Sequence, residues 1–129
     1  MLVPTSKLVA LDTEFRCLAS NVYHEARGES MKGKIAVALV TLNRSEDERF
    51  PKTICGVVYQ KHQFSWTKSI KRFNLNDEQW QQSVEAAREA YTNRSALGSF
   101  KAMYFHAKSI NPGWNLHKVA TIGQHTFYK

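Results

Sequence analysis

Glu25, in the stretch NVYHEARGES, is the side chain of this sequence best placed for acid–base chemistry. Before it, apolar residues recur at steps of three and four, the spacing that puts side chains on one face of an α-helix. These residues are Leu8, Leu11, Phe15, Leu18 and Val22, and the opposite face carries Asp12, Arg16, Ser20, His24 and Arg27. At about 100° per residue, Glu25 falls roughly 20° from Leu18. The spacing therefore predicts a carboxyl group on the apolar face.

A carboxyl group held against apolar neighbours loses hydration, and its pKa rises above the free value of about 4.3. With a pKa raised by roughly two units, Glu25 stays protonated near neutral pH and can donate a proton to a leaving group. The alternative is a helix-terminal glutamate that pairs with Arg27, or that is exposed because the helix frays before Gly28. Periodicity alone leaves both interpretations open.

Cleavage of a glycosidic bond commonly uses two carboxyl groups, so we looked for a second carboxyl group that could lie close to Glu25. Glu29 would lie about 5 to 6 Å away if the helix continued, but Gly28 is expected to end it. We therefore expect Glu29 to start the next helix or to form a salt bridge. Asp12 and Glu14 lie about 16 to 20 Å back along the helix. The sequence indicates one carboxyl group that works without a close partner.

The sequence gives little support for a metal site or for a serine or cysteine nucleophile. The stretch HEARG resembles the start of a His-Glu-x-x-His zinc motif, but Gly28 occupies the position of the second histidine. The other histidines lack the spacing of metal ligands, and the cysteines form no CxxC pair. No serine or cysteine lies in a recognisable nucleophile elbow. We expect neither a metal nor a cofactor.

Aromatic residues outside the helical stripes predict the walls of a ligand groove, because rings on irregular segments can stack on sugar faces or bases. Tyr104, beside a polar strand position, and Trp114, within a turn, are the rings expected to contact the ligand. Polar side chains nearby would supply hydrogen bonds. The predicted substrate-binding residues are Gln63, Ser65, Tyr104, His106, Asn111 and Trp114.

Length and charge limit the class of protein. With 129 residues, the chain suits one domain over 1–129. No stretch approaches a membrane span, and the N-terminus shows no signal peptide. The net charge of +7 suits a polyanionic partner such as nucleic acid, an anionic membrane face or an acidic wall polymer. Because the lysines and arginines are dispersed, we expect a solvated surface and no nucleic-acid partner.

Capping signals and periodicity predict four helices. The first runs from about Ser6 to Arg27, and the second follows a cap at Ser30, forming a helical hairpin with it. A short helix begins after Thr53, and residues 60–76 form a long loop. The last helix spans Asp77 to about Tyr91, with Asn76 as its cap and Gln79 in the capping-box position.

The last third of the chain predicts short antiparallel strands in 102–107 and 118–129, separated by an Asn-Pro-Gly turn signal. The expected architecture is a mostly helical α+β domain. Cys17 and Cys55 could pair in principle, but two cysteines are too few for a disulfide framework. We expect both to be free thiols.

Several ordered blocks of the sequence resemble the SleB/CwlJ-like cell wall hydrolases. LASNVYHEARGES is similar to the opening block of that family, and GKIAVALVTLNR to the helix that follows. FPKTICGVVYQKHQFSW resembles the next block, and AMYFHAKSINPGW with VATIGQHTFYK resembles the C-terminal signatures. The resemblance covers nearly the whole chain, from about Leu18 to Lys129.

The resemblance implies a lysozyme-like or resuscitation-factor-like domain that cleaves the MurNAc–GlcNAc glycan strands of peptidoglycan. The family's catalytic acid is the first glutamate of EARGE, which corresponds to Glu25. In the family's lytic transglycosylases this carboxyl protonates the glycosidic oxygen and then, as carboxylate, helps the C6 hydroxyl of muramic acid to close an anhydro ring. A muramidase on the same substrate is the alternative. A nucleic-acid-binding module and a catalytically idle wall-binding domain are the rivals from other classes.

The spore-lytic members also carry a signal peptide and a separate wall-binding domain, which we do not find in this sequence. We therefore expect a protein that is made in the cytoplasm and acts on the cell wall after release, as a phage endolysin does, or after export by another route. We also expect a monomer.

Overall fold

The computed structural model describes the backbone of residues 5–60 and 77–129 and the side chains of residues 13–60 and 77–129. These residues form the helices α1 (Thr5–Ala26), α2 (Met31–Ser45), α3 (Ile54–Val58) and α4 (Glu78–Thr92) and the strands β1 (Tyr104–Ala107), β2 (Lys118–Ile122) and β3 (His125–Tyr128). The α+β class with a small antiparallel sheet is confirmed. The loop predicted for 60–76 lies almost wholly outside the described residues.

Helix α1 is central, because α2, α3 and α4 all pack against it. Its predicted apolar stripe is buried at Leu18 and Val22, which join the core with apolar side chains of α2 and α4. Ser20 was expected on the solvated face but is buried. This expectation was wrong because the neighbouring helices cover more of α1 than one face.

Local capping signals account for the ends of most helices. The Ser30 side chain accepts a hydrogen bond from Gly33 N, and Thr53 accepts one from Gly56 N, so both predicted caps are confirmed. The cap of α4 was predicted one residue too early. The residue that caps this helix is Asp77, whose carboxylate accepts a hydrogen bond from Gln79 N.

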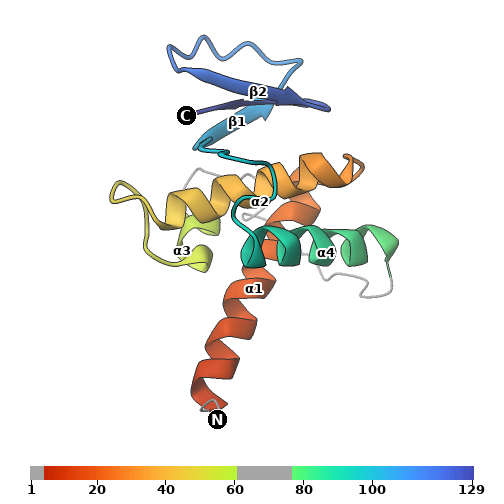
Figure 1. Ribbon diagram of the computed structural model, residues 1–129, viewed down its shortest axis with the longest axis vertical. Coiled ribbons are helices and arrows are strands. Elements are labelled where there is room, and N and C mark those ends of the chain that lie inside the picture. The colour runs from red at the N-terminus through yellow and green to blue at the C-terminus, as the bar shows by residue number, and fades with distance from the viewer. Residues whose placement is uncertain (1–4, 61–76) are drawn as a thin grey trace.

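The three strands form an antiparallel sheet in the order β1-β3-β2. Figure 1 shows this sheet as a layer over α2, on the side away from α4. Strands β2 and β3 form a hairpin in which Gly123 turns the chain at φ 57°, a conformation that favours glycine. The sheet brings β1 and β3 close to the end of α1 that carries Glu25.

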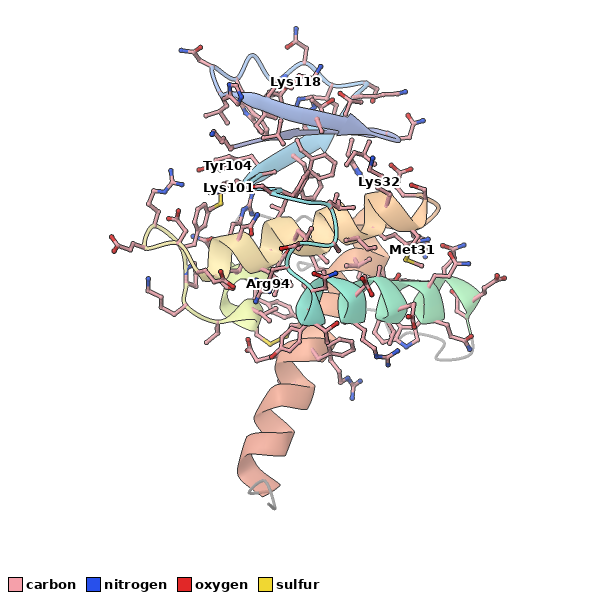
Figure 2. All side chains as sticks on the ribbon, in the orientation of Figure 1. Met31, Lys32, Arg94, Lys101, Tyr104 and Lys118 are labelled. Carbon is pink, nitrogen blue, oxygen red and sulfur yellow. A yellow bond between two sulfur atoms is a disulfide. The ribbon has the colours of Figure 1, made fainter. Side chains whose placement is uncertain are left out.

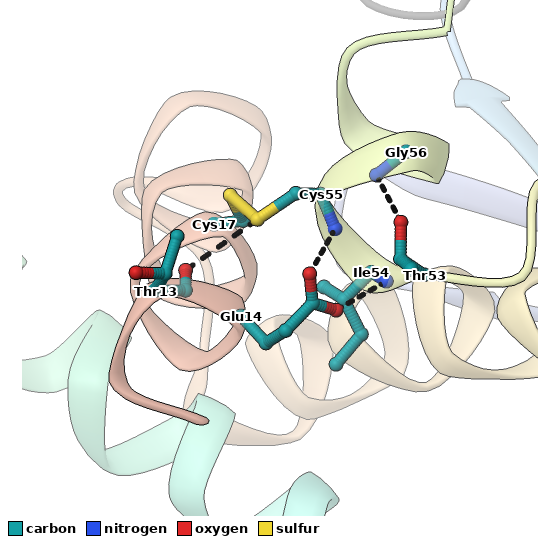
Figure 3. Close-up of a disulfide and its surroundings, with 7 residues drawn as sticks. All are labelled: Thr13, Glu14, Cys17, Thr53, Ile54, Cys55 and Gly56. Atoms are coloured by element: carbon teal, nitrogen blue, oxygen red, sulfur yellow. Dashed lines mark hydrogen bonds between the residues drawn. A yellow bond between two sulfur atoms is a disulfide. The ribbon is translucent and has the colours of Figure 1, made fainter. Parts of the chain in front are cut away.

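A disulfide joins Cys17 of α1 to Cys55 of α3, so the expectation of two free thiols was wrong (Figure 3). The packing of α3 against α1 brings the two Cα atoms to 5.2 Å, within the range that a disulfide spans. Glu14 strengthens the same contact, because its carboxylate accepts hydrogen bonds from Ile54 N and Cys55 N, at 2.6 and 3.4 Å. These amides have no partner within their own helix.

Candidate active site

A cavity of about 840 Å³ lies where the C-terminal end of α1, the end of α2 and the sheet meet. Its walls come from elements far apart in sequence. Its lining residues are Glu25, Arg44, Tyr104, Phe105, His106, Ala107, Ile110, Trp114, Asn115, Leu116 and His125. Among these, Glu25 is the carboxylic acid. Among the described residues, the cavity lining therefore presents one acidic group to a ligand, surrounded mainly by aromatic and apolar side chains.

Glu25 lies in the last turn of α1, on the face that the helical periodicity predicts. Burial raises the pKa of its carboxyl group from 4.5 to about 7, and the nearby positive charge of Arg44 limits the rise. A carboxyl group with this pKa is substantially protonated at neutral pH, and its conjugate base is also available. Both states that an acid–base catalyst needs are thus accessible.

Arg44, which the sequence analysis did not single out, lies beside Glu25 in the cavity wall. Its Nε donates a 2.6 Å hydrogen bond to the Met103 carbonyl, and its guanidinium lies 5.3 Å from the ring centroids of both Phe50 and Tyr104. Burial lowers the pKa of Arg44 to about 10, so it remains a cation at neutral pH. No local signal marks it, because a basic residue in the last turn of a helix is common at the surface.

The aromatic wall forms around Trp114, which projects from the segment between β1 and β2 and is 40% exposed. Its ring packs edge-to-face against Tyr104, His106 and Tyr128, with centroids 5.1 to 6.2 Å apart. Figure 2 shows Tyr104 between the sheet and α2. Ile110 and Leu116 add exposed apolar surface to the same wall. An exposed apolar patch inside a cavity is typical of a ligand-binding surface.

The other predicted site residues are distributed differently. His106 lines the cavity, but both of its ring nitrogens have protein partners, Nδ1 at 2.7 Å from the Ala107 carbonyl and Nε2 at 2.9 Å from the Tyr128 hydroxyl. Asn111 is exposed and not part of the lining, and its side chain accepts a hydrogen bond from Gly113 N. Gln63 and Ser65 lie outside the described residues.

Glu29 is not part of the cavity lining. Helix α1 ends at Ala26, and Gly28 takes φ 88°, so the chain turns before Glu29 as expected. The Glu29 carboxylate accepts a 2.7 Å hydrogen bond from Gln124 N in the β2–β3 turn. It is therefore tied to the sheet and does not face Glu25 across the cavity.

His125, also missed by the sequence analysis, lines the cavity from β3. Its Nδ1 lies 3.5 Å from Glu29 Oε1, and burial lowers the pKa of its imidazole. The available signal was strand alternation, because His125 shares a face with Phe127, which is fully buried. A histidine on the apolar face of a strand is unusual enough to notice.

Two searches of the described residues were negative. No set of three or more His, Cys, Asp or Glu side chains there is arranged to hold a metal ion. No described helix combines the length and apolar character needed to cross a membrane.

Comparison with known sequences gives one family. The family model described as Cell Wall Hydrolase matches residues 28–128, a range that begins just after Glu25. The spore cortex-lytic enzymes of Oceanobacillus iheyensis and Bacillus subtilis (strain 168) are each 30% identical to the chain over 90% of its length. The chain corresponds to 41% and 37% of these relatives, about two fifths of their length.

Solved structures give the same relationship. The catalytic domain of the germination-specific lytic transglycosylase SleB from Bacillus anthracis superimposes with a TM-score of 0.76 and 28% identity, covering 90% of this chain and 93% of that one. The catalytic domain of the Bacillus cereus SleB protein gives a TM-score of 0.75 and 25% identity, covering 92% and 91%. The similarity to these structures thus extends over almost the entire chain.

Proposed function

The chain belongs to the cell wall hydrolase family, and on this premise we propose that it is a lytic transglycosylase that cleaves the MurNAc–GlcNAc glycan strand of peptidoglycan. The observation that carries the proposal is Glu25, a partly buried acid with a pKa of about 7 in a cavity of about 840 Å³. The similar structures support the reaction type, since one of those proteins is named a lytic transglycosylase.

In the first step, protonated Glu25 donates its proton to the glycosidic oxygen as the bond from that oxygen to C1 of MurNAc breaks. Positive charge then develops at C1 and the ring oxygen. The resulting Glu25 carboxylate lies in the same cavity and stabilises this charge, because a low-dielectric site strengthens the attraction. Arg44 limits the pKa of Glu25 and so favours loss of the proton.

In the second step, the Glu25 carboxylate accepts the proton of the MurNAc C6 hydroxyl while O6 forms a bond to C1. The product is a 1,6-anhydro ring, and the carboxyl group is again protonated for the next cycle. This route needs no carboxylate to activate water. It suits a cavity whose described lining contains one carboxylic acid.

The aromatic wall would hold the glycan. Trp114 and Tyr104 offer ring surface for stacking on sugar faces, and Ile110 and Leu116 extend the apolar contact. Stacking positions the glycosidic bond relative to Glu25 without adding charge to the site. Substrate orientation of this kind is a large part of glycosidase catalysis.

The test is to digest purified sacculi and to analyse the released glycan ends by mass spectrometry. The proposal expects 1,6-anhydromuramic ends from the wild-type protein and no release by Glu25→Gln, which keeps the shape of the side chain but removes the acid. Reducing muramic ends would mean a muramidase instead. Intact glycan, or full activity of Glu25→Gln, would overturn the proposal.

The basic charge of the chain allows a direct check against the nucleic-acid alternative. Binding to nucleic acid through lysines and arginines would weaken steeply as salt is raised. The proposal expects retention on sacculi and no comparable retention on DNA or RNA.

We also propose that the protein acts at the cell wall, as a monomer. The Cys17–Cys55 disulfide supports a place of action outside the reducing cytoplasm, because disulfides persist in oxidising compartments. Fractionation of the producing cells and sedimentation of the purified protein test the two statements. The route by which the protein reaches the wall stays a prediction.

A further inference from the structure

The turn between β2 and β3 is built around the Glu29 carboxylate. Glu29 Oε1 accepts the Gln124 N–H at 2.7 Å, and the side chain is 13% exposed. A Cβ atom added to Gly123 would lie 2.7 Å from the same oxygen, so the Glu29 carboxylate would have to move from its present position to make room for it. The turn and Glu29 are therefore complementary in both shape and hydrogen bonding.

Glu29 is itself held in place from the helical side. Its backbone N–H donates to the Ala26 carbonyl at 3.0 Å, and its carbonyl accepts a 2.9 Å hydrogen bond from Lys34 Nζ. The Lys34 amine, which belongs to a buried residue, also donates to Gln82 Oε1 on α4. Glu29 thus connects the helices, through its backbone, to the β2–β3 hairpin, through its side chain.

His125 directly follows Gln124, whose backbone N–H is bonded to Glu29. The His125 imidazole lines the same cavity as Glu25. Its Nδ1 is buried and lies 3.5 Å from Glu29 Oε1, so this nitrogen faces Glu29 and leaves Nε2 as the ring nitrogen for a ligand in the cavity. The ring packs against Phe105 and Phe127, with centroids 5.1 and 6.2 Å away. A movement of the turn would therefore move this imidazole within the cavity wall.

We propose that Glu29 is a positioning residue that holds the β2–β3 turn, and that the turn thereby presents the His125 imidazole for a hydrogen bond with the glycan. This inference rests on the proposed function and adds a polar contact to the aromatic wall. It separates the two glutamates of EARGE by role. Glu25 reacts with the substrate, and Glu29 fixes the wall against which the substrate lies.

Two substitutions of Glu29 distinguish positioning from acid–base chemistry. Glu29→Gln keeps an oxygen that can accept the Gln124 N–H, whereas Glu29→Ala removes it. Both remove the negative charge near Lys34, so their difference isolates the acceptor. The proposal expects glycan cleavage by Glu29→Gln within about threefold of wild type and a loss on the order of 100-fold for Glu29→Ala. Equal loss in both variants, or wild-type activity of Glu29→Ala, would overturn it.

Substitutions of two glycines test the contact between Glu29 and the β2–β3 turn from the side of the turn. Gly123→Ala strains the backbone at positive φ and also places a methyl group against the Glu29 carboxylate. Gly98→Ala is the matched control, because Gly98 has φ 73° but nothing within 4 Å of the added Cβ. The proposal expects Gly123→Ala to lose at least tenfold more activity than Gly98→Ala, at comparable melting temperatures. Equal activity of the two variants would contradict it.

Hydrogen exchange at the Gln124 amide provides a measurement that needs no activity. The proposal expects slow exchange in wild type and Glu29→Gln and faster exchange in Glu29→Ala. Equal exchange in all three would show that the carboxylate does not hold the turn.

The His125 contact is tested by binding, so that it can fail separately from the catalytic proposal. In a Glu25→Gln background, His125→Phe keeps a ring to pack against Phe105 and Phe127 but removes the imidazole. We expect it to bind soluble, peptide-free glycan strands about tenfold more weakly, the loss of roughly one hydrogen bond. His125→Gln should recover part of the affinity. Unchanged affinity of His125→Phe would remove His125 from the site, whatever the outcome with Glu25.

Discussion

Replacing Glu25 by glutamine should stabilise the protein, and the gain should grow as the pH rises. Burial raises the pKa of Glu25 to about 7 in the folded state, whereas the unfolded chain has the ordinary value of 4.5. Between these two values the folded protein binds more protons than the unfolded chain, so stability falls as the pH rises. Glutamine does not titrate, so Glu25→Gln lacks this loss.

The size of the effect follows from the two pKa values. A shift from 4.5 to about 7 corresponds to about 3 kcal/mol of lost stability once the pH exceeds the folded pKa. Most of this loss, about 2 to 3 kcal/mol, falls between roughly pH 5 and roughly pH 8. For a domain of this size the melting temperature should change by about 10 °C.

The assay is urea or thermal unfolding of wild type and Glu25→Gln at several pH values across that interval. The difference in the free energy of unfolding between the two proteins should increase with pH. Glu85→Gln is the matched control, because it makes the same chemical change on α4 at a side chain that is 63% exposed. If the difference for Glu25→Gln does not increase with pH more than the difference for Glu85→Gln, burial does not raise the pKa of Glu25 and the catalytic argument fails.

Three further predictions concern the same cavity and its support. Wild-type cleavage should decline above about pH 7 as Glu25 loses its proton. Arg44→Met removes the positive charge that limits the pKa of Glu25, so it should move this decline upward by about one pH unit, whereas Arg44→Lys keeps the charge and should not. An unchanged pH profile for Arg44→Met would contradict the electrostatic role of Arg44. Paired Cys17→Ser and Cys55→Ser substitutions should lower the free energy of unfolding by about 4 kcal/mol, as expected for a disulfide between residues 38 positions apart, and denaturant unfolding measures it. Trp114→Ala should weaken glycan binding at least tenfold with little change in melting temperature, because Trp114 is partly exposed; undiminished binding would exclude the stacking surface.

Much of the helical frame was predictable because its signals are local. The stripe through Leu18 and Val22 required a helix with one apolar face, and Glu25 falls on that face by its spacing alone. Ser30 and Thr53 cap the helices that follow them. The cap of α4 was misplaced because Asn76 and Asp77 are adjacent, and either side chain can accept the hydrogen bond of a helix amide.

The site needed the tertiary structure wherever its parts come from different elements. Arg44 is an ordinary helix-end arginine by sequence, and only the packing of α2 beside α1 and β1 makes it the buried cation next to Glu25. Cys17 and Cys55 looked like free thiols because nothing in the sequence brings α3 against α1. Asn111 was predicted to contact the sugar, and only the structure shows that its side chain accepts a hydrogen bond within its own turn.

Sequence by itself thus determined the approximate extents of the helices and strands and the helix face on which Glu25 lies, because periodicity and capping act over one or two turns. The tertiary structure decided how strongly burial raises the pKa of Glu25 and how Glu29 is used. The hydrogen bond from Gln124 to Glu29 joins residues 95 positions apart. Such a contact depends on which faces bury one another when the whole chain packs, and no short window of sequence contains that information.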